Sequence, residues 1–174
     1  MRKIVISLIF CTAMICFAKA SSPYYSTATQ KVFEDYVGQW NVVYSNQTDK
    51  GMPVGGRGVS VSTLTMGKTI LQFENKLDFK LGNITTYYLI GYDKNAQKYY
   101  FLSYNDASDS PALLWGEYLK DKQMFEFKNY EGKPQNGDMR LDIKFERKDK
   151  LLINSYTLID GEEKPTLDMA YIKK

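Results

Sequence analysis

The sequence contains no histidine, and its two cysteines, Cys11 and Cys16, both lie within the first twenty residues. Without histidine, the chain has no Ser-His-Asp or Cys-His catalytic group, no imidazole ligand for haem and almost no means of building a zinc site. If the first twenty residues are removed, no thiol remains for a disulfide or a nucleophile. These absences predict that the protein is not an enzyme and holds no metal or cofactor.

Residues 1–20 have the three parts of a secretory signal peptide: a basic start, an apolar stretch and a small-x-small ending, namely Arg2 and Lys3, residues 4–17, and Ala18-Lys19-Ala20. The apolar stretch of about 14 residues is shorter than the roughly 20 that a membrane-spanning helix requires. We therefore expect cleavage near Ala20 and a periplasmic or secreted protein without a stable membrane anchor.

Without residues 1–20, the chain has no excess of positive or negative charge. Three of the 23 Lys and Arg residues lie in it (Arg2, Lys3 and Lys19), but none of the 20 Asp and Glu residues do, so cleavage changes the net charge from +3 to zero. A neutral domain lacks the basic face that nucleic-acid binding requires. We expect no nucleic-acid partner.

The rest of the chain predicts one domain. Residues 21–30 are small and polar and indicate a flexible leader. The domain then spans residues 31–174 and opens with a short helix at 31–37, where the apolar residues fall on one face. After Gly38 the dominant signal is a period-two alternation, which is typical of half-buried strands. Ten strands are predicted, at about residues 40–45, 59–66, 69–77, 84–93, 98–104, 112–119, 124–130, 139–147, 151–160 and 167–173.

Short turns such as Asn136-Gly137 and Asp160-Gly161 connect these strands, so that sequential neighbours are antiparallel. Ten such strands either close on themselves or leave two exposed edges, and closure removes the edges. The predicted fold is all-β, a closed antiparallel up-and-down β-barrel of about ten strands with a short N-terminal helix. A two-sheet sandwich is the alternative.

Gly38-Gln39-Trp40 resembles the glycine-x-tryptophan signature that opens lipocalins and other calycin barrels. Residues 32–173 resemble a bacterial family of exported domains, the domain of unknown function fifteen-seventy-nine. Further motifs carry this resemblance: Gly91-Tyr92-Asp93, Tyr99-Tyr100-Phe101, Tyr104-Asn105-Asp106, Trp115-Gly116, Arg140, Gly161 and Met169-Ala170-Tyr171-Ile172-Lys173. The resemblance implies a lipocalin-like barrel but no activity. The family usually ends on an arginine that packs across the signature tryptophan, and Lys173 implies a looser contact there.

Other patterns in the sequence give weaker indications of a catalytic or binding site. Four carboxylates on predicted strands are candidates for a hydrolase or isomerase, although the alternation places each on a solvated face: Glu74, Glu117, Glu126 and Asp142. Residues 105–110 are rich in oxygen ligands but lack the glycine and terminal glutamate of a calcium loop. Residues 54–58 are rich in glycine, yet no lysine and helix follow, so a strand bend is favoured over a phosphate loop.

Aromatic residues give the positive indication of function, with 14 Tyr, 9 Phe and 2 Trp. Tyrosine has an apolar body and a polar tip, which suits a ligand cavity. We predict that the barrel binds a small, largely apolar molecule, with Trp40 at the closed end, and that the binding residues are Trp40, Tyr44, Tyr88, Phe101 and Trp115. The alternative is a filled barrel whose loops or tyrosine-rich surface bind a protein or a glycan.

Overall fold

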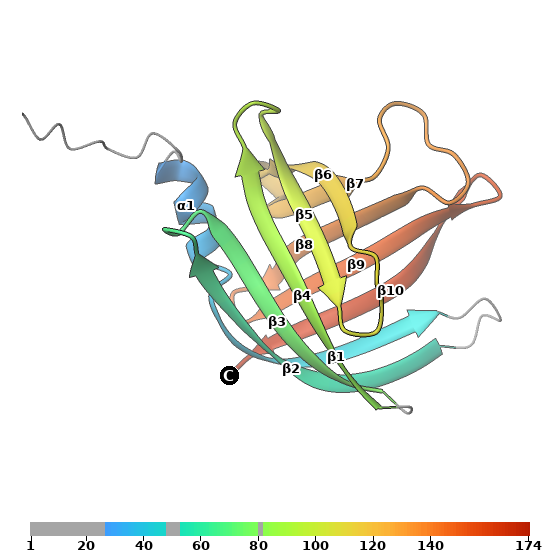
Figure 1. The fold of residues 1–174 in the computed structure, drawn as a ribbon, viewed down its shortest axis with the longest axis horizontal. Coiled ribbons are helices and arrows are strands. Elements are labelled where there is room, and N and C mark those ends of the chain that lie inside the picture. The colour runs from blue at the N-terminus through green and yellow to red at the C-terminus, as the bar shows by residue number, and fades with distance from the viewer. Residues whose placement is uncertain (1–26, 48–52, 80–81) are drawn as a thin grey trace, which may run out of the picture.

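The computed structural model describes residues 27–47, 53–79 and 82–174, which form a short helix and ten strands. The elements are α1 (Thr27–Glu34), β1 (Gly38–Gln47), β2 (Pro53–Thr65), β3 (Ile70–Phe79), β4 (Gly82–Asp93), β5 (Lys98–Asn105), β6 (Ala112–Leu119), the 3-10 helix η1 (Lys120–Lys122), β7 (Met124–Lys128), β8 (Met139–Arg147), β9 (Lys150–Ile159) and β10 (Glu162–Lys173). Each strand pairs antiparallel with its neighbours, and β1 pairs with β10 to close the barrel (Figure 1). The predicted closed barrel is confirmed.

The starts of three elements differ from the prediction, and the predicted helix ends at Glu34 instead of residue 37. Helix α1 begins at Thr27, so residues 27–30 of the expected flexible leader are helical. Strand β2 begins at Pro53 and includes the glycine run. The glycines allow β3 to lie close, since a Cβ atom on Gly58 would be 2.3 Å from the Lys76 carbonyl oxygen of that strand. Strand β10 begins at Glu162 because a register shift accommodates Pro165. The predicted signal peptide and residues 21–26 lie outside the described residues.

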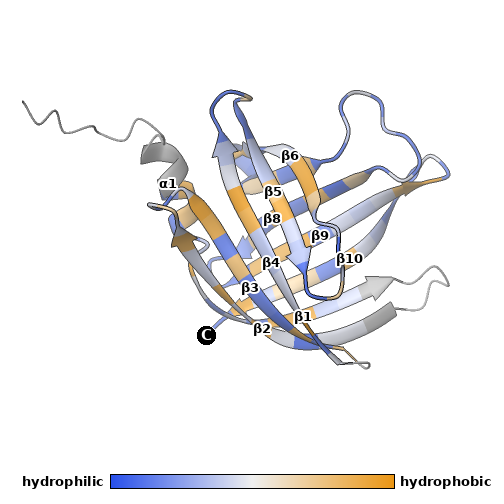
Figure 2. Ribbon diagram, in the orientation of Figure 1, coloured by the Kyte–Doolittle hydropathy of each residue, from blue (hydrophilic) through white to orange (hydrophobic). Residues whose placement is uncertain are grey.

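Alternation along the strands separates the barrel interior from its outer surface. In β3, the side chains at every second position, Leu71, Phe73, Asn75 and Leu77, are buried, whereas those between them are more exposed. Figure 2 shows the same alternation of hydrophobic and hydrophilic residues on the strands, and a hydrophilic connection between β7 and β8. One face of each strand therefore builds a common core.

Helix α1 closes one end of the barrel. Its Phe33, together with Tyr36 just after it, is buried against Phe125 of β7, with ring centroids 6.0 and 5.6 Å apart. Trp40 is fully buried at this closed end, and the Lys173 Nζ atom lies 5.2 Å from the centre of its ring. Lys173 thus contacts the signature tryptophan through a cation–π interaction, in which its ammonium group lies over the ring.

Two serines on the inner face of β2 provide a matched test of this closed end. The Trp40 indole N–H donates to Ser62 Oγ (2.8 Å), and that hydroxyl donates to the Tyr36 carbonyl oxygen (2.5 Å). We expect Ser62→Ala to lower the free energy of unfolding by about 1–3 kcal/mol, because it leaves a buried indole donor unpaired. The measurement is urea denaturation followed by circular dichroism.

Ser60 is the control, because its hydroxyl is equally buried but has no hydrogen-bond partner among the described residues. Ser60→Ala removes an unsatisfied polar group and is expected to be neutral or stabilising. Equal losses in the two variants would contradict the assigned hydrogen bonds.

Candidate functional site

A cavity of about 260 Å³ opens at the end of the barrel opposite α1. Its lining residues come from the inner faces of β1, β3, β4, β5 and β10: Tyr44, Leu77, Phe79, Ile84, Thr86, Tyr88, Ser103, Asn105, Leu167 and Met169. None of these side chains is an acid, a lysine or an arginine. The cavity is therefore a mostly apolar pocket with a few neutral hydrogen-bonding groups, which is the usual chemistry of a small-molecule site.

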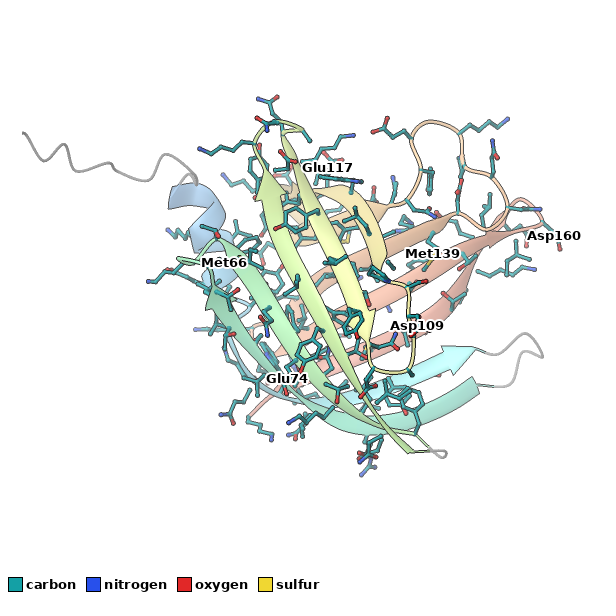
Figure 3. The ribbon with its side chains drawn as sticks, viewed as in Figure 1. Met66, Glu74, Asp109, Glu117, Met139 and Asp160 are labelled. Atoms are coloured by element: carbon teal, nitrogen blue, oxygen red, sulfur yellow. The ribbon has the colours of Figure 1, made fainter. Side chains whose placement is uncertain are left out.

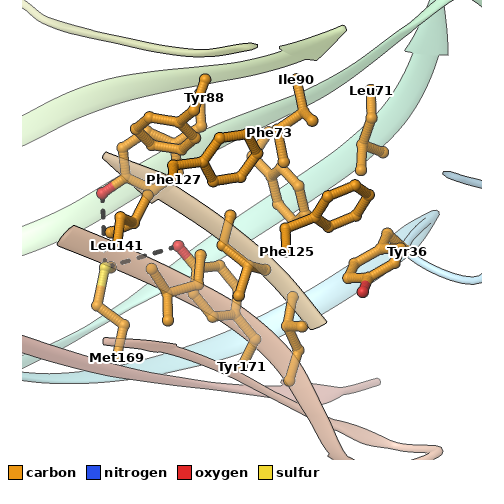
Figure 4. Close-up of a cluster of buried hydrophobic side chains, with 14 of the residues drawn as sticks. Tyr36, Leu71, Phe73, Tyr88, Ile90, Phe125, Phe127, Leu141, Met169 and Tyr171 are labelled. Atoms are coloured by element: carbon orange, nitrogen blue, oxygen red, sulfur yellow. Dashed lines mark hydrogen bonds between the residues drawn. The ribbon is translucent and has the colours of Figure 1, made fainter. Parts of the chain in front are cut away.

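The floor of the cavity is a hydrogen-bonded group of buried side chains. The Tyr88 hydroxyl donates to the Met169 sulfur (3.5 Å), and the Tyr171 hydroxyl lies 3.7 Å from the same sulfur (Figure 4). Tyr171 also donates to Asn75 Oδ1 (3.0 Å), and the Asn75 amide donates to the Thr86 carbonyl oxygen (3.2 Å). Each polar tip has a partner, so the floor is held in one arrangement.

Below this floor the barrel is filled. Phe73, Phe127 and Ile143 are fully buried, and the rings of Phe73 and Tyr171 meet edge to face at 5.9 Å (Figure 4). The interior thus has a solid half next to α1 and a hollow half at the mouth. A ligand has room only in the hollow half.

The wall beside β1 is held by Tyr44. Its hydroxyl donates to the Asp78 carbonyl oxygen (2.7 Å), and its ring centroid lies 4.7 Å from that of Phe79. This position requires glycine on the neighbouring strand, because a Cβ atom on Gly56 would lie 2.2 Å from the Tyr44 hydroxyl oxygen. The glycine run that resembled a phosphate loop therefore makes room for an aromatic wall.

Burial keeps the floor tyrosines protonated. Desolvation raises the pKa of Tyr88 to about 12, and it raises the pKa of Tyr171 well above its usual value. Both hydroxyls are consequently neutral donors at physiological pH. The cavity presents no charge to a bound molecule from its lining or from these two floor tyrosines.

The predicted binding residues occupy different places. Tyr44 and Tyr88 line the cavity. Phe101 lies next to Tyr88, with ring centroids 5.2 Å apart, and packs against Phe127 in the filled half. Trp40 is at the closed end, away from the mouth. Tyr44 and Tyr88 are thus the members of the set that the structure brings together at one cavity.

The prediction that Trp115 lines the interior is wrong. Its side chain lies on the outer face of β6 and is 36% exposed, whereas the neighbouring Leu114 is buried inside. Residues 112–115 are all apolar, so alternation did not identify the inner face of this strand, and an error of one residue reverses every side chain.

Sequence reasoning missed most of the cavity wall. Leu77, Ile84 and Met169 were assigned to strands but not to a site, and the small polar residues Thr86 and Ser103 were not considered. The available signal was a set of small or neutral polar residues that point inward. They lie near the ends of strands that meet at the same end of the barrel. Recognising it required the strand register.

The carboxylate candidates lie on the outer face of the barrel. Asp142 differs from the expected solvated side chain, because it is buried beneath Arg140, which pairs with it and with Glu163 (2.8 Å) and packs over the Tyr156 ring (4.2 Å). Desolvation raises the pKa of Asp142, and the nearby guanidinium opposes this shift. Asp142 therefore belongs to a structural ion-pair cluster.

The oxygen-rich loop at 105–110 uses its ligands for turn geometry. Asn105 Oδ1 accepts from the Ala107 backbone N–H (3.0 Å), and the Asp106 carboxylate accepts from the Thr85 backbone N–H (3.1 Å). Within 27–47, 53–79 and 82–174, no group of three or more potential metal ligands is found. None of the helical segments that the structure describes is long and apolar enough to cross a bilayer.

The comparison with family models decides the classification. The model described as "Protein of unknown function (DUF1579)" matches residues 26–173. The chain belongs to the DUF1579 family. No curated protein matches the sequence.

Solved structures share the fold of this DUF1579 barrel. The S-type phycobiliprotein lyase CPES from Guillardia theta superposes with a TM-score of 0.60 at 14% identity, covering 83% of this chain and 92% of that one. Rv2717c from M. tuberculosis superposes with a TM-score of 0.59 at 11% identity, covering 86% of this chain and 98% of that one. At these identities the likeness establishes the fold.

The prediction that the protein is not an enzyme is corrected by the first of these structures. A protein named as a lyase carries the same type of barrel. The missing histidine excludes particular catalytic groups, but it does not exclude catalysis on this fold.

Proposed function

We propose that this DUF1579 barrel binds a small, largely apolar and uncharged molecule in the cavity at its mouth. The observation that supports this most directly is the neutral wall of the cavity above a fully hydrogen-bonded floor. Burying a charged group there would leave it without a partner, which is costly. An apolar ligand with one or two hydrogen-bonding groups is complementary to this lining.

The volume of the cavity suggests the size of the bound part. An apolar cavity of about 150 Å³ holds one benzene molecule. The mouth cavity, at about 260 Å³, therefore suits a ligand somewhat larger than one aromatic ring, or one end of a longer molecule. Thr86, Ser103 and Asn105 would orient its polar groups.

The proposal includes action outside the cytoplasm, which rests on the signal-peptide pattern of residues 1–20. Native mass spectrometry of the protein purified from its own host tests both parts in one sample. The expected result is a chain that begins at Ser21 and carries a reproducible small-molecule mass that is released on denaturation. A chain that retains residues 1–20 contradicts export, and an empty chain that also fails the dye test described next contradicts binding.

Filling the cavity is expected to abolish binding of an uncharged apolar dye. Ser103 faces the cavity from β5, whereas the adjacent Leu102 points to the outer surface. We expect Ser103→Phe to weaken binding of N-phenyl-1-naphthylamine by at least about tenfold, because the ring occupies space that the dye requires. The measurement is a fluorescence titration of the dye.

Leu102→Phe is the matched control, because it places the same ring one residue away on the outside. It is expected to bind the dye as the unaltered protein does. If Ser103→Phe retains full affinity while its thermal unfolding is unchanged, the dye does not bind in the mouth cavity and the proposed site is wrong.

A further inference from the structure

A second concave site lies on the outer surface, away from the mouth cavity. It is a groove of about 540 Å³, roughly twice the volume of the mouth cavity. Strands β6 and β7, the β4–β5 turn and the β7–β8 connection form it, with the lining residues Gln97, Lys98, Trp115, Gly116, Glu117, Glu126, Lys128, Asn129, Tyr130, Glu131 and Gly132. We call this site the outer groove. It shares no lining residue with the mouth cavity.

Trp115 provides an aromatic surface in the outer groove. The residue is 36% exposed, and its ring meets the ring of Tyr100 edge to face, with centroids 6.2 Å apart. Tyr100 in turn lies across Gly91, where a Cβ atom would be 2.2 Å from its hydroxyl oxygen. The tryptophan is therefore supported from the side while part of its surface remains open to solvent.

The charges in the outer groove largely neutralise one another. Lys128 pairs with Glu126 (2.6 Å), and Lys98 pairs with Glu131 of the β7–β8 connection (2.6 Å). Glu117, labelled in Figure 3, lies opposite Glu126 in the β6–β7 register and has no ion-pair partner among the described residues. The outer groove thus offers an unpaired carboxylate acceptor, amide groups and two internal ion pairs. Its acidic residues disfavour phosphate or other anions.

We propose that the outer groove binds a neutral oligosaccharide. A pyranose ring has an apolar face of C–H groups and a rim of hydroxyl groups. The solvent-exposed part of the Trp115 ring complements the C–H face, and the Glu117 carboxylate accepts hydrogen bonds from the hydroxyl groups. A wholly apolar ligand would leave the charged side chains of this groove desolvated, which disfavours it.

The two tryptophans make binding directly observable. Trp40 is fully buried, whereas Trp115 is exposed in the outer groove. Titration of the full-length mature protein with cellohexaose, maltohexaose, xylohexaose, mannohexaose and chitohexaose is expected to change the tryptophan emission for at least one sugar, and the change should disappear in Trp115→Phe. Isothermal titration calorimetry measures the affinity independently of fluorescence.

Trp115→Ala is expected to weaken the binding of that sugar by at least about tenfold, because truncating a tryptophan that contacts a ligand usually costs more than 1 kcal/mol. Leu113→Ala is the matched control: Leu113 lies on the same face of β6 and is 49% exposed, but it does not line the outer groove. This control should bind the sugar normally. Both variants should keep the circular dichroism spectrum and the thermal unfolding midpoint of the unaltered protein, which shows that each is folded.

Two results would overturn the proposal. The first is the absence of binding to every sugar of the panel, or unchanged affinity in Trp115→Ala. The second is sedimentation of the unaltered protein as a dimer that Trp115→Ala dissociates, which would show that a second copy of the chain occupies this surface. Failure of the mouth-cavity proposal leaves these results unaffected, because the two sites have no residue in common.

Discussion

Phe125→Ala is expected to lower the free energy of unfolding by about 3–5 kcal/mol, the usual cost of removing a fully buried phenylalanine ring. Phe125 has no exposed surface, and it links the helix cap to the strands. Its ring centroid lies 5.6 Å from that of Tyr36, 5.0 Å from that of Tyr99 and 4.8 Å from that of Tyr118. Because the neighbouring rings come from separate segments, they cannot all move in to fill the space.

Urea denaturation followed by circular dichroism measures this effect, and Leu113→Ala is the control. Leu113 is 49% exposed on the outer face of β6, so its truncation should change the stability by about 0.5 kcal/mol or less. A loss below 1 kcal/mol for Phe125→Ala would contradict the close packing between α1 and the barrel.

The protein is expected to lose stability steeply above pH 10. Tyrosine in the unfolded chain has a pKa of about 10. Burial raises the pKa of Tyr88 to about 12, and it raises the pKa of Tyr36 and of Tyr171 well above the usual value. Between these values the unfolded state binds fewer protons than the folded state. The free energy of unfolding therefore falls as the pH rises, by about 1.4 kcal/mol per pH unit for each tyrosine and about 4 for the three.

The tyrosine contribution is fully present below pH 10, and the share of Tyr88 is lost by about pH 12. Urea denaturation at a series of pH values from 8 to 11.5 measures the slope. Tyr88→Phe removes one of the three groups and should reduce this slope by about one third. An unfolding midpoint that does not change between pH 9 and 11 would contradict the buried, neutral state of these hydroxyls.

The barrel was predictable because most of its strands have one solvent-exposed face and one buried face. In β8, Leu141 and Ile143 alternate with Arg140 and Lys144, and a strand with this pattern has only one way to face the core. Short turns then fixed the antiparallel order. The start of β2 was not predictable in this way, because its glycines serve contacts with other strands, which local alternation does not reveal.

The site was predictable only in part, for a physical reason. Tyr44 and Tyr88 were identified because large aromatic residues at inward positions are informative. Trp115 was misplaced because apolar side chains occupy both faces of β6. Met169 was missed because its role depends on Tyr88, which is 81 residues away in the sequence. Whether an inward residue fills the core or borders empty space depends on how many neighbours reach it, and that requires the three-dimensional structure.

The pairing of β1 with β10 also has a consequence for the time at which the chain folds. Trp40 lies opposite Lys173, so the first strand finds one of its two partners only when the last strand has been made. All the other pairings are between consecutive strands and form locally, but the final closure spans nearly the whole domain and is slow for that reason. In a nascent chain the barrel therefore cannot close at β1 before β10 has left the ribosome.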